Sequence, residues 1–589
     1  MTAANLHLRW AELLVDALVA AGVREAVVSP GSRSTPLVLA LAGRPELRLD
    51  VLVDERVAGF FALGEARATG RPPVLVCTSG SAGAHYLPAV LEADEAGVPL
   101  VVLTADRPPE LLHRQAAQTT VQRDFFGGHA RLFHDVGLPS QSEAALAGVR
   151  VAAALAVARA LGPRPGPVHL NVPFGKPLEA VPENAEDAGL AALVRDLRSR
   201  ALPRVLAGAA GADAGAVRAL AAAVRAEPRG VILAGPAPLG GTVAAAVVEA
   251  LAARLGYPIL AETTSQHRRR AASAAPRVEL VDLLAPDPRV QRPGAPGLVL
   301  QLGRPVTSAA WQRFFEGQPP GRWVLGGDGW ADPWGGAAAI VPGDITRLLE
   351  ALLAELGPGG PAQPDWAAGW SAADLRVRDA VGQWLSEEGA AGHFSELAAV
   401  RAVMAALPPD ALLVVGNSLA VREVDLTPPP GNGVGVVHQR GVAGIDGLIS
   451  GAAGAAVGSG RPTVALLGDL AALHDLGGLA AAGLLRAPLV LVVLANRGGR
   501  LFELLPLAAG PLEASAVERL FLTPVDVRLA DAAAAFGLPA LQARTTEELA
   551  AAVSQALGQA KATVVEAVMS GPGPGVRWRA LRERARAAR

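Results

Sequence analysis

The chain is poor in cysteine, lysine and net charge, and each shortage excludes a class of protein. Its single cysteine, Cys77, excludes an intrachain disulfide and a zinc site built from cysteines. Because Cys77 lies in an apolar segment, we expect a buried thiol. The formal net charge of −2 gives no general attraction to nucleic acid or anionic lipid. The only lysines are Lys176 and Lys561, so we expect anions to be bound by arginine side chains or backbone amides.

Long apolar runs and targeting segments are also missing. The longest apolar run, 489–495, is too short to cross a bilayer. The N-terminal segment carries Glu12 and Asp16 within its apolar periodicity and has no basic stretch followed by an apolar core, so it does not resemble a signal peptide. We therefore expect a soluble cytoplasmic protein.

What the chain does contain is a repeat. Residues 71–107 and 461–497 both begin and end with arginine, and each holds an apolar strand, a turn, an Ala/Leu helix and a second apolar strand. Self-similarity on this scale indicates one βαβ unit used in two related domains. Different polar residues follow the equivalent strands of the two copies, which suggests one site shared between two halves of the protein.

The order of predicted elements indicates an α/β protein of three domains. With 589 residues, 51% hydrophobic and 18% charged, the chain is long enough for several globular domains. Strands that alternate with helices predict doubly wound parallel sheets with helices on both faces. Stretches near 180–205 and 357–361 have the composition of linkers. The predicted domains are 1–182, 200–355 and 385–570, of which the first and third are related.

Three smaller expectations concern local features. Thr35 is expected to cap a helix that has Pro36 at its first position. Arg268 begins a run of three arginines that we expect to lie on the surface. The tail from Arg577 to Arg589 is expected to be a short basic helix or a frayed end without a catalytic role.

Two polar residues of the third block follow apolar strands. Asp469 comes after one strand and Asn496 after the next. Ligands of parallel sheets bind at the carboxyl ends of the strands, and a carboxylate, an amide oxygen and a loop carbonyl suit Mg²⁺. The alternative is that Asp469 caps a helix and Asn496 a turn. Glu55 also follows an apolar strand, and taken alone it would be an ordinary loop glutamate.

Four segments make the chain resemble a known family. Residues 29–37 read SPGSRSTPL, 104–111 TADRPPEL, 416–422 GNSLAVR and 440–447 RGVAGIDG. Together with the Gly-Asp and Asn motifs of the third block, they resemble the thiamine-diphosphate-dependent enzymes and, within them, the carboligases of menaquinone biosynthesis. The resemblance covers nearly the whole chain. It implies the thiamine-diphosphate-binding fold, with pyrimidine-binding, central and diphosphate-binding domains in that order.

The resemblance implies thiamine diphosphate as cofactor and Mg²⁺ or Mn²⁺ as its metal. Glu55 would be the catalytic carboxylate that faces N1′ of the cofactor pyrimidine, and Ile445 the apolar residue that props the cofactor into a bent form. Asp469, Asn496 and the Gly498 carbonyl would bind the metal. The remaining cofactor contacts would come from Ser418, Leu470, Leu501 and Phe502.

The implied reaction decarboxylates 2-oxoglutarate and adds the resulting four-carbon carbanion to isochorismate. Both substrates are dicarboxylates, and the planar guanidinium of arginine accepts a carboxylate through two hydrogen bonds. The alternative for these arginines is a purely structural role in salt bridges. The implied substrate contacts are Ser32, Arg33, Arg107, Gln118, Ser418, Arg422 and Arg440.

Two other functions stay open at this point. A different 2-oxoacid decarboxylase or an acetohydroxyacid synthase would share the fold, although the added cations suit a polycarboxylate substrate better. An inactive structural or regulatory paralogue would have no need of an intact Glu55 with Asp469 and Asn496. The resemblance also implies a homodimer or a dimer of dimers, a homotetramer, with active sites at the subunit interface and no nucleic-acid or membrane partner.

Overall fold

The protein contains three six-stranded sheets, and all their strand pairings are parallel. Packing divides the chain into two compact units. Unit 1 comprises residues 1–208, 439–460 and 475–484, and unit 2 comprises 209–438, 461–474 and 485–589. The structure is a computed structural model that describes residues 6–179, 187–203, 205, 211, 213–239, 244–268, 275–287, 294–317, 321–327, 329–360, 363–427 and 433–589.

The first sheet lies in unit 1, and its inner strands are buried along their whole length. Strands covered by helices on both faces need apolar residues at every position, and β3 reads VLVC with all four residues buried. The sheet order is β2 (Arg48–Val51), β1 (Glu25–Val28), β3 (Val74–Cys77), β4 (Leu100–Asp106), β6 (Pro167–Pro173) and β5 (Phe133–Asp135).

The third sheet lies in unit 2 and repeats the topology of the first. Counted within its own domain, each sheet runs second, first, third, fourth, sixth and fifth strand. This shared order confirms that the first and third domains are related. The third sheet contains β14 (Gly435–His438), β13 (Leu412–Val415), β15 (Thr463–Gly468), β16 (Leu489–Ala495), β18 (Ala562–Val568) and β17 (Ala540–Ala543).

The central sheet, also in unit 2, has a different order. Counted within its domain, it runs third, second, first, fourth, fifth and sixth strand, the usual order of a dinucleotide-type doubly wound sheet. It therefore shares its class with the outer sheets but not their topology. Its strands are β9 (Arg277–Val278), β8 (Ile259–Ala261), β7 (Gly230–Ala234), β10 (Leu298–Leu302), β11 (Gly321–Leu325) and β12 (Ala337–Val341).

Helices cover the sheets through apolar faces spaced three and four residues apart. Those of unit 1 are α1 (Leu6–Ala20), α2 (Thr35–Ala42), α3 (Glu55–Thr69), α4 (Leu87–Ala96), α5 (Glu143–Leu161), α6 (Asp187–Ser199), α14 (Leu448–Ser459) and α16 (Gly478–Gly483). Those of unit 2 are α7 (Ala214–Ala226), α8 (Ala245–Leu255), α9 (Ala309–Gly317), α10 (Ile345–Leu356), α11 (Pro364–Ala390), α12 (Glu396–Ala406), α13 (Leu419–Leu426), α15 (Asp469–His474), α17 (Ala514–Val517), α18 (Leu529–Ala535), α19 (Thr546–Leu557) and α20 (Pro574–Ala588).

Helix α5 is the one described helix that is long and apolar enough to cross a membrane by length and composition alone. Its residues Leu146, Val149 and Ala153 are buried in the hydrophobic core of the first sheet, together with Leu14 of α1. One face of α5 therefore packs against the first sheet.

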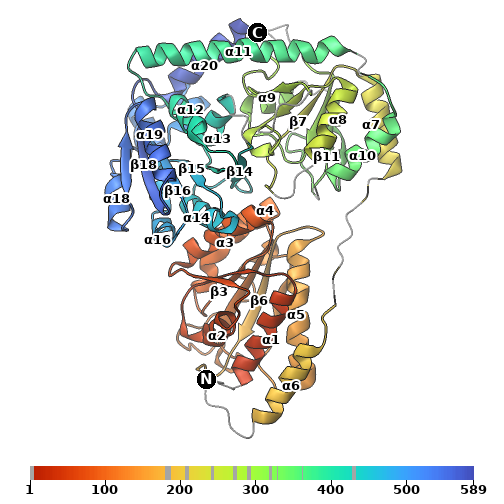
Figure 1. Cartoon of the computed structure of the whole chain (residues 1–589), viewed down its shortest axis with the longest axis vertical. Helices are drawn as coiled ribbons and strands as arrows, with labels where there is room; N and C mark the ends of the chain where they lie inside the picture. Colours follow the sequence, from red (N-terminus) through yellow and green to blue (C-terminus); the bar gives the residue numbers. More distant parts are fainter. Residues whose placement is uncertain are drawn as a thin grey trace. The chain divides into compact units, whose positions relative to one another are not determined.

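Helices α3 and α14 lie side by side in unit 1 (Figure 1) and approach closely because both carry glycines at their contact. A Cβ atom added at Gly64 of α3 would lie 2.0 Å from the carbonyl oxygen of Gly451, and one added at Gly454 of α14 would lie 1.9 Å from that of Phe61. Any larger residue at Gly64 or Gly454 would push the helices apart. The third sequence block thus contributes a helix to the unit built around the first sheet.

Two local expectations are wrong. The stretch 180–205 is not wholly a linker, because α6 forms within it; Leu190, Val194 and Leu197 have helical spacing and pack in the core of the first sheet. Thr35 does not cap α2 but is its first residue, with Ser34 as the capping residue. The Thr35 hydroxyl donates back to the Ser32 carbonyl at 2.7 Å instead.

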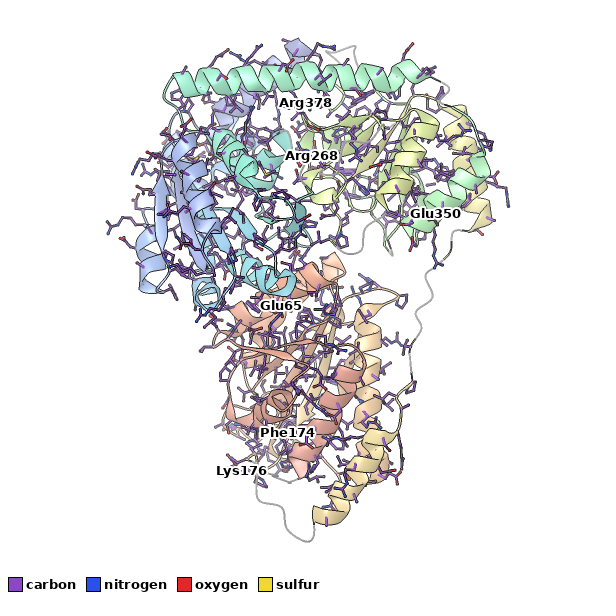
Figure 2. All side chains as sticks on the ribbon, in the orientation of Figure 1. Glu65, Phe174, Lys176, Arg268, Glu350 and Arg378 are labelled. Carbon is purple, nitrogen blue, oxygen red and sulfur yellow. The ribbon has the colours of Figure 1, made fainter. Side chains whose placement is uncertain are left out.

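The arginine run that begins at Arg268 is not a surface feature at its first residue. Arg268 is buried and forms an ion pair with Asp425 of α13, and it also donates to the backbone carbonyls of Val424 and Thr427. Figure 2 labels this side chain between the central sheet's domain and α13. The other two arginines of the run lie outside the described residues. The first residue of this arginine run therefore links the central domain to the third domain within unit 2.

Candidate active site

Glu55 is the first residue of α3, directly after β2 and its connecting loop. The carboxylate of Asp54 accepts the backbone N–H of Arg56 at 2.9 Å and so caps the helix. Burial raises the pKa values of the Cys77 thiol and the Tyr86 hydroxyl, and the nearby charge of Glu55 raises both further. The Glu55 carboxylate therefore lies close to the carboxyl end of β3. Cys77 itself is buried and unpaired with any other cysteine, as expected.

Three predicted substrate residues converge on Thr78 and Ser79, which follow β3. The guanidinium of Arg107, at the end of β4, donates to the Ser79 hydroxyl. The side-chain amide of Gln118 donates to the Ser79 carbonyl at 3.1 Å. The backbone N–H of Arg33 donates to the neighbouring Thr78 hydroxyl at 3.3 Å. The structure thus brings residues from three segments to one edge of the first sheet, and their role toward substrate stays a prediction.

Arg33 and Arg107 lie close enough to repel each other. Arg33 is buried, and one terminal nitrogen donates to the Phe174 carbonyl at 2.7 Å. Burial lowers the pKa of the Arg33 guanidinium, and the charge of Arg107 lowers it further, while the Asp106 carboxylate opposes this fall. The buried Nε atom of Arg33 has no hydrogen-bond partner within the described part of the chain. Two adjacent cations with an unused donor form a site that a carboxylate would stabilise. Ser32 lies exposed beside them.

A buried polar network supports this cationic edge, and sequence reasoning missed it. The Asn171 side-chain amide donates to Asp106 at 3.0 Å and to Asp135 at 2.9 Å. Asp106 in turn accepts the backbone N–H of Arg107 at 2.7 Å. Burial raises the pKa of the Asp106 carboxyl. The network fixes the backbone that carries Arg107, and only the pairing of β4 with β6 reveals it.

The loop that carries Arg440 and Ile445 belongs to unit 1. Ile445 is 39% exposed, an unusual position for isoleucine and one that suits contact with a ligand. The carboxylate of Glu92 in α4 accepts backbone N–H groups from residues 441–443 at 2.7, 2.7 and 3.3 Å. Glu92 is only 2% exposed and also pairs with Arg67 of α3. Sequence reasoning missed Glu92, whose one signal is an acidic residue on an apolar helix face.

Asp469 is buried at the start of α15 in unit 2 and joins two loops. Its carboxylate accepts the backbone N–H of Leu470 at 2.7 Å and that of Gly498 at 3.0 Å. Burial raises the pKa of the Asp469 carboxyl, and these amides oppose that rise. Gly498 has φ +116°, and a Cβ there would lie 2.2 Å from the Leu522 carbonyl oxygen, so only glycine fits. The structure therefore brings Asp469 and Gly498 together, and their role as metal ligands stays a prediction.

The amide of Asn496 has one hydrogen-bonded end and one end without a hydrogen-bond partner among the described residues. Its Nδ2 atom donates to Glu396 at 2.9 Å. Its Oδ1 atom is buried and has no hydrogen-bond partner in the described structure. A buried amide oxygen left unpaired is costly unless something else binds it. Asn496 lies two residues before Gly498, whose N–H binds Asp469, and its unpaired oxygen is of the type that binds a hard divalent cation.

The other predicted residues of unit 2 lie on the same edge of the third sheet. Ser418 precedes α13 with φ +65°, and its carbonyl accepts the guanidinium of Arg422 at 2.6 Å. Leu501 and Phe502 belong to a short 3₁₀ helix that follows Gly498, and the Phe502 ring packs on Phe521. No cluster of three or more His, Cys, Asp or Glu side chains suited to a metal occurs among the described residues. A cation at Asp469 would thus need amide and carbonyl oxygens as its further protein ligands.

Two family models match the chain, one in each outer domain. Residues 8–126 match the thiamine pyrophosphate enzyme N-terminal TPP binding domain. Residues 435–567 match the thiamine pyrophosphate enzyme C-terminal TPP binding domain. The two matched ranges contain Glu55 and the Asp469–Asn496 pair respectively.

Curated relatives match over almost the whole length. A protein of Sorangium cellulosum is 44% identical over 97% of this chain and 94% of its own length. One of Myxococcus xanthus is 41% identical over 94% of this chain and 93% of its own, and one of Geobacillus kaustophilus is 40% identical over 90% and 89%. All three are named 2-succinyl-5-enolpyruvyl-6-hydroxy-3-cyclohexene-1-carboxylate synthase.

A solved structure agrees in fold. Benzoylformate decarboxylase from Polynucleobacter necessarius superposes with a TM-score of 0.72 over 96% of this chain and 99% of its own, at 16% sequence identity. That likeness supports three parallel α/β domains of this type, and at such low identity it extends to the fold alone.

Proposed function

This chain belongs to the 2-succinyl-5-enolpyruvyl-6-hydroxy-3-cyclohexene-1-carboxylate synthases, a family of thiamine-diphosphate enzymes, and from that membership we propose its reaction and its working residues. It removes CO₂ from 2-oxoglutarate and joins the remaining four carbons to isochorismate, as a carboligase of menaquinone biosynthesis. We place this reaction in the cytoplasm, the compartment that suits such a biosynthetic role.

The observation that carries the substrate assignment is the pair of adjacent guanidiniums at the edge of the first sheet. Arg33 and Arg107 repel each other, and burial of Arg33 limits the relief that water gives. A carboxylate placed between them would remove that repulsion and use the free Arg33 Nε. Both proposed substrates carry two carboxylates. Gln118 and Ser32 add neutral hydrogen-bonding groups, and Ser418, Arg422 and Arg440 supply the further contacts.

The cofactor, when bound, supplies a carbon nucleophile that no protein side chain offers. The protein's own side chains position the cofactor and its metal. Glu55 holds a proton at N1′ of the pyrimidine, and Ile445 provides an apolar support for the cofactor. Asp469, Asn496 and the Gly498 carbonyl hold a Mg²⁺ or Mn²⁺ ion that neutralises the diphosphate. The unpaired Asn496 Oδ1 supports this metal set.

A substrate panel tests the reaction. Purified protein with thiamine diphosphate and Mg²⁺ should release CO₂ from 2-oxoglutarate and yield the carboligation product, identified by mass, only when isochorismate is present. Pyruvate and benzoylformate should be poor substrates. Ready turnover of pyruvate without isochorismate would favour the rival, a general 2-oxoacid decarboxylase. No CO₂ from any 2-oxoacid, despite cofactor binding, would favour an inactive paralogue.

We propose an obligate homodimer or dimer of dimers in which Glu55 and Asp469 of one site come from different subunits. A mixture of Glu55→Gln and Asp469→Ala chains tests this arrangement. Random mixing makes half of the dimers hybrid, and each hybrid has one intact pair, so about a quarter of the sites should regain activity. No recovery after verified subunit exchange would place both residues of a site in one chain.

A further inference from the structure

Two buried glutamates hold neighbouring residues of the C-terminal helix α20. Glu396, the first residue of α12, forms an ion pair with Arg577. Glu423 of α13 accepts the indole N–H of Trp578 at 2.7 Å. Both carboxylates are nearly inaccessible, 1% exposed for Glu396 and 3% for Glu423. Helix α20 also lies beside α11 (Figure 1). The tail 577–589, which the sequence analysis expects to be a short basic helix or a frayed end, is therefore an ordered part of unit 2.

Glu396 differs from Glu423 in one contact. Its second oxygen accepts the Nδ2 group of Asn496 at 2.9 Å. The three side chains form a line from α20 through α12 to the end of β16: Arg577, Glu396 and Asn496. The Oδ1 atom of Asn496, at the end of this line, has no partner in the described structure.

The chemistry of this line dictates which way the amide points. An asparagine side chain can turn over and exchange its donor and acceptor ends. A carboxylate paired with a guanidinium presents only acceptor oxygens, so it accepts Nδ2 and turns Oδ1 away from itself. A neutral amide at position 396 could instead donate to Oδ1 and let Nδ2 face the opposite way. Only the first orientation offers an oxygen to a cation.

We propose that Glu396 is a positioning residue that orients the Asn496 amide so that its oxygen binds the divalent cation, with Arg577 of the C-terminal helix holding Glu396 in place. This inference rests on the metal site proposed above. The partners of metal ligands typically change affinity by about 10- to 100-fold when they are mutated. The proposed line is such a partner, contributed by two helices outside the repeated βαβ unit.

The test measures Mn²⁺ affinity directly, by electron paramagnetic resonance of free Mn²⁺ with saturating thiamine diphosphate and no substrate. Glu396→Gln keeps the size of the side chain and should raise the dissociation constant by about 10- to 100-fold. Glu423→Gln is the matched control, because it changes the other buried carboxylate that holds α20 and leaves Asn496 untouched. It should keep the wild-type affinity. Equal losses in the two variants would mean that docking of α20 alone matters and would overturn the proposal.

A double-variant cycle separates orientation from packing. Asn496→Asp presents an oxygen in either orientation and so has no need of Glu396. In that background, Glu396→Gln should leave Mn²⁺ affinity unchanged or improve it, because it also removes a like charge. A further loss of tenfold or more would contradict orientation as the role of Glu396. If Glu396→Gln yields no folded protein, Glu396→Asp replaces it, since its shorter side chain withdraws the acceptor and keeps the charge for Arg577. Wild-type affinity in Glu396→Asp would overturn the proposal.

Asn496→Ala distinguishes failure of this inference from failure of the metal site. If Asn496→Ala leaves Mn²⁺ affinity unchanged, the metal assignment itself is wrong, and the role of Glu396 is overturned with it. If Asn496→Ala weakens Mn²⁺ binding and Glu396→Gln does not, the metal site stands and the positioning role is overturned.

Discussion

The first and third sheets share one topology and carry opposite chemistry at equivalent positions. Ser79 and Asp469 each lie eight positions after the arginine that begins their copy of the repeat. In the first sheet, Ser79 accepts a hydrogen bond from the Arg107 guanidinium, and the edge is cationic. In the third sheet, Asp469 accepts the backbone N–H of Gly498, and this edge is the one proposed to bind a cation. In both, the loops after the third and fourth strands are tied together.

The comparison teaches that the repeated fold fixes where functional residues stand but not what they are. Parallel strands bring loop residues to the same edge whatever their chemistry. The two copies could therefore diverge without a change of strand order. The first copy is proposed to bind substrate carboxylates, and the second is proposed to bind the cofactor diphosphate with its metal. Three substitutions test this division of roles, in order of decreasing expected effect, and a fourth and smaller effect concerns the pH dependence of stability.

Asp469→Ala should have the largest effect. It removes the only anionic ligand proposed for the metal, so metal-dependent binding of thiamine diphosphate should be lost by calorimetry. Asn496→Ala should act in the same direction and more mildly. Ser79→Ala, at the equivalent position of the first sheet, is the control and should leave cofactor affinity near wild type. If cofactor affinity is unchanged in Asp469→Ala, the metal is not bound at this edge of the third sheet.

Glu55→Gln should lower turnover by about 10², a typical loss for a proton-transfer partner. The substitution keeps the size of a half-buried side chain at the start of α3, so the fold should persist. The measurement is the exchange rate of the C2 proton of bound cofactor, followed by NMR after an acid quench. Asp54→Asn changes the neighbouring capping carboxylate and serves as control. If the exchange rate of the C2 proton is unchanged in Glu55→Gln, a group other than Glu55 assists this proton transfer.

Arg107→Lys should raise the Michaelis constant for one substrate by roughly 10- to 100-fold, because hydrogen bonds to charged groups contribute about 1.5–3 kcal/mol. It keeps the charge and loses the planar fork. Cofactor affinity should not change, since the metal edge belongs to the other copy of the repeat. Arg497→Lys, the equivalent arginine of the third sheet, is exposed and is the matched control. If Arg107→Lys and Arg497→Lys change the Michaelis constant equally, the edge of the first sheet has no specific role in binding substrate carboxylates.

The smallest effect concerns pH. Burial lowers the pKa of His169 in β6 from 6.5 to about 3, and burial raises the pKa of Glu423 in α13 from 4.5 to about 7. Unfolded protein binds the His169 proton below about pH 6.5 and folded protein does not, so this histidine makes the free energy of unfolding rise with pH between about 3 and 6.5. Folded protein keeps the Glu423 proton that unfolded protein loses above about pH 4.5, so this glutamate makes it fall between about 4.5 and 7.

The two slopes oppose each other between pH 5 and 6.5, each worth roughly 2 kcal/mol over that range. Denaturant unfolding at both pH values measures them. Glu423→Gln removes the falling contribution, so its stability should rise more steeply with pH than that of the wild type. His169→Asn should rise less steeply. If the free energy of unfolding of the wild type, Glu423→Gln and His169→Asn depends on pH in the same way, then His169 and Glu423 are not both buried in their neutral forms.

The sequence predicts the fold well wherever apolar runs and small residues decide it. The longest apolar run, 489–495, is strand β16 with the same bounds. Short edge strands such as β17, which reads ALQA, were missed because they lack the continuous apolar run of an inner strand. The stretch around α6 was misjudged because its acidic surface outweighed three spaced apolar residues.

The site divides in the same way. Residues inside a recognisable motif, such as Arg33, Arg107 and Asp469, could be named from the sequence, and the structure shows each in the segment that follows a strand. The residues that contact the predicted loops from distant parts of the sequence could not. Glu92, Glu396 and Arg577 contact partners that lie 349, 100 and 181 positions away. Pairings at such separations leave no local pattern, because they arise only when distant helices dock.

The hold of Glu92 on residues 441–443 bears on how such an enzyme can be rebuilt from parts. The loop that carries Arg440 and Ile445 follows β14 in the chain, yet its backbone is anchored by α4, with Arg67 of α3 behind the anchor. A chimera that takes its first domain from a relative would therefore also exchange the support of a loop encoded more than three hundred residues later. Exchange of the domain and the loop together would preserve that fit, so the unit of modular exchange here is a contact pair rather than a continuous stretch of sequence.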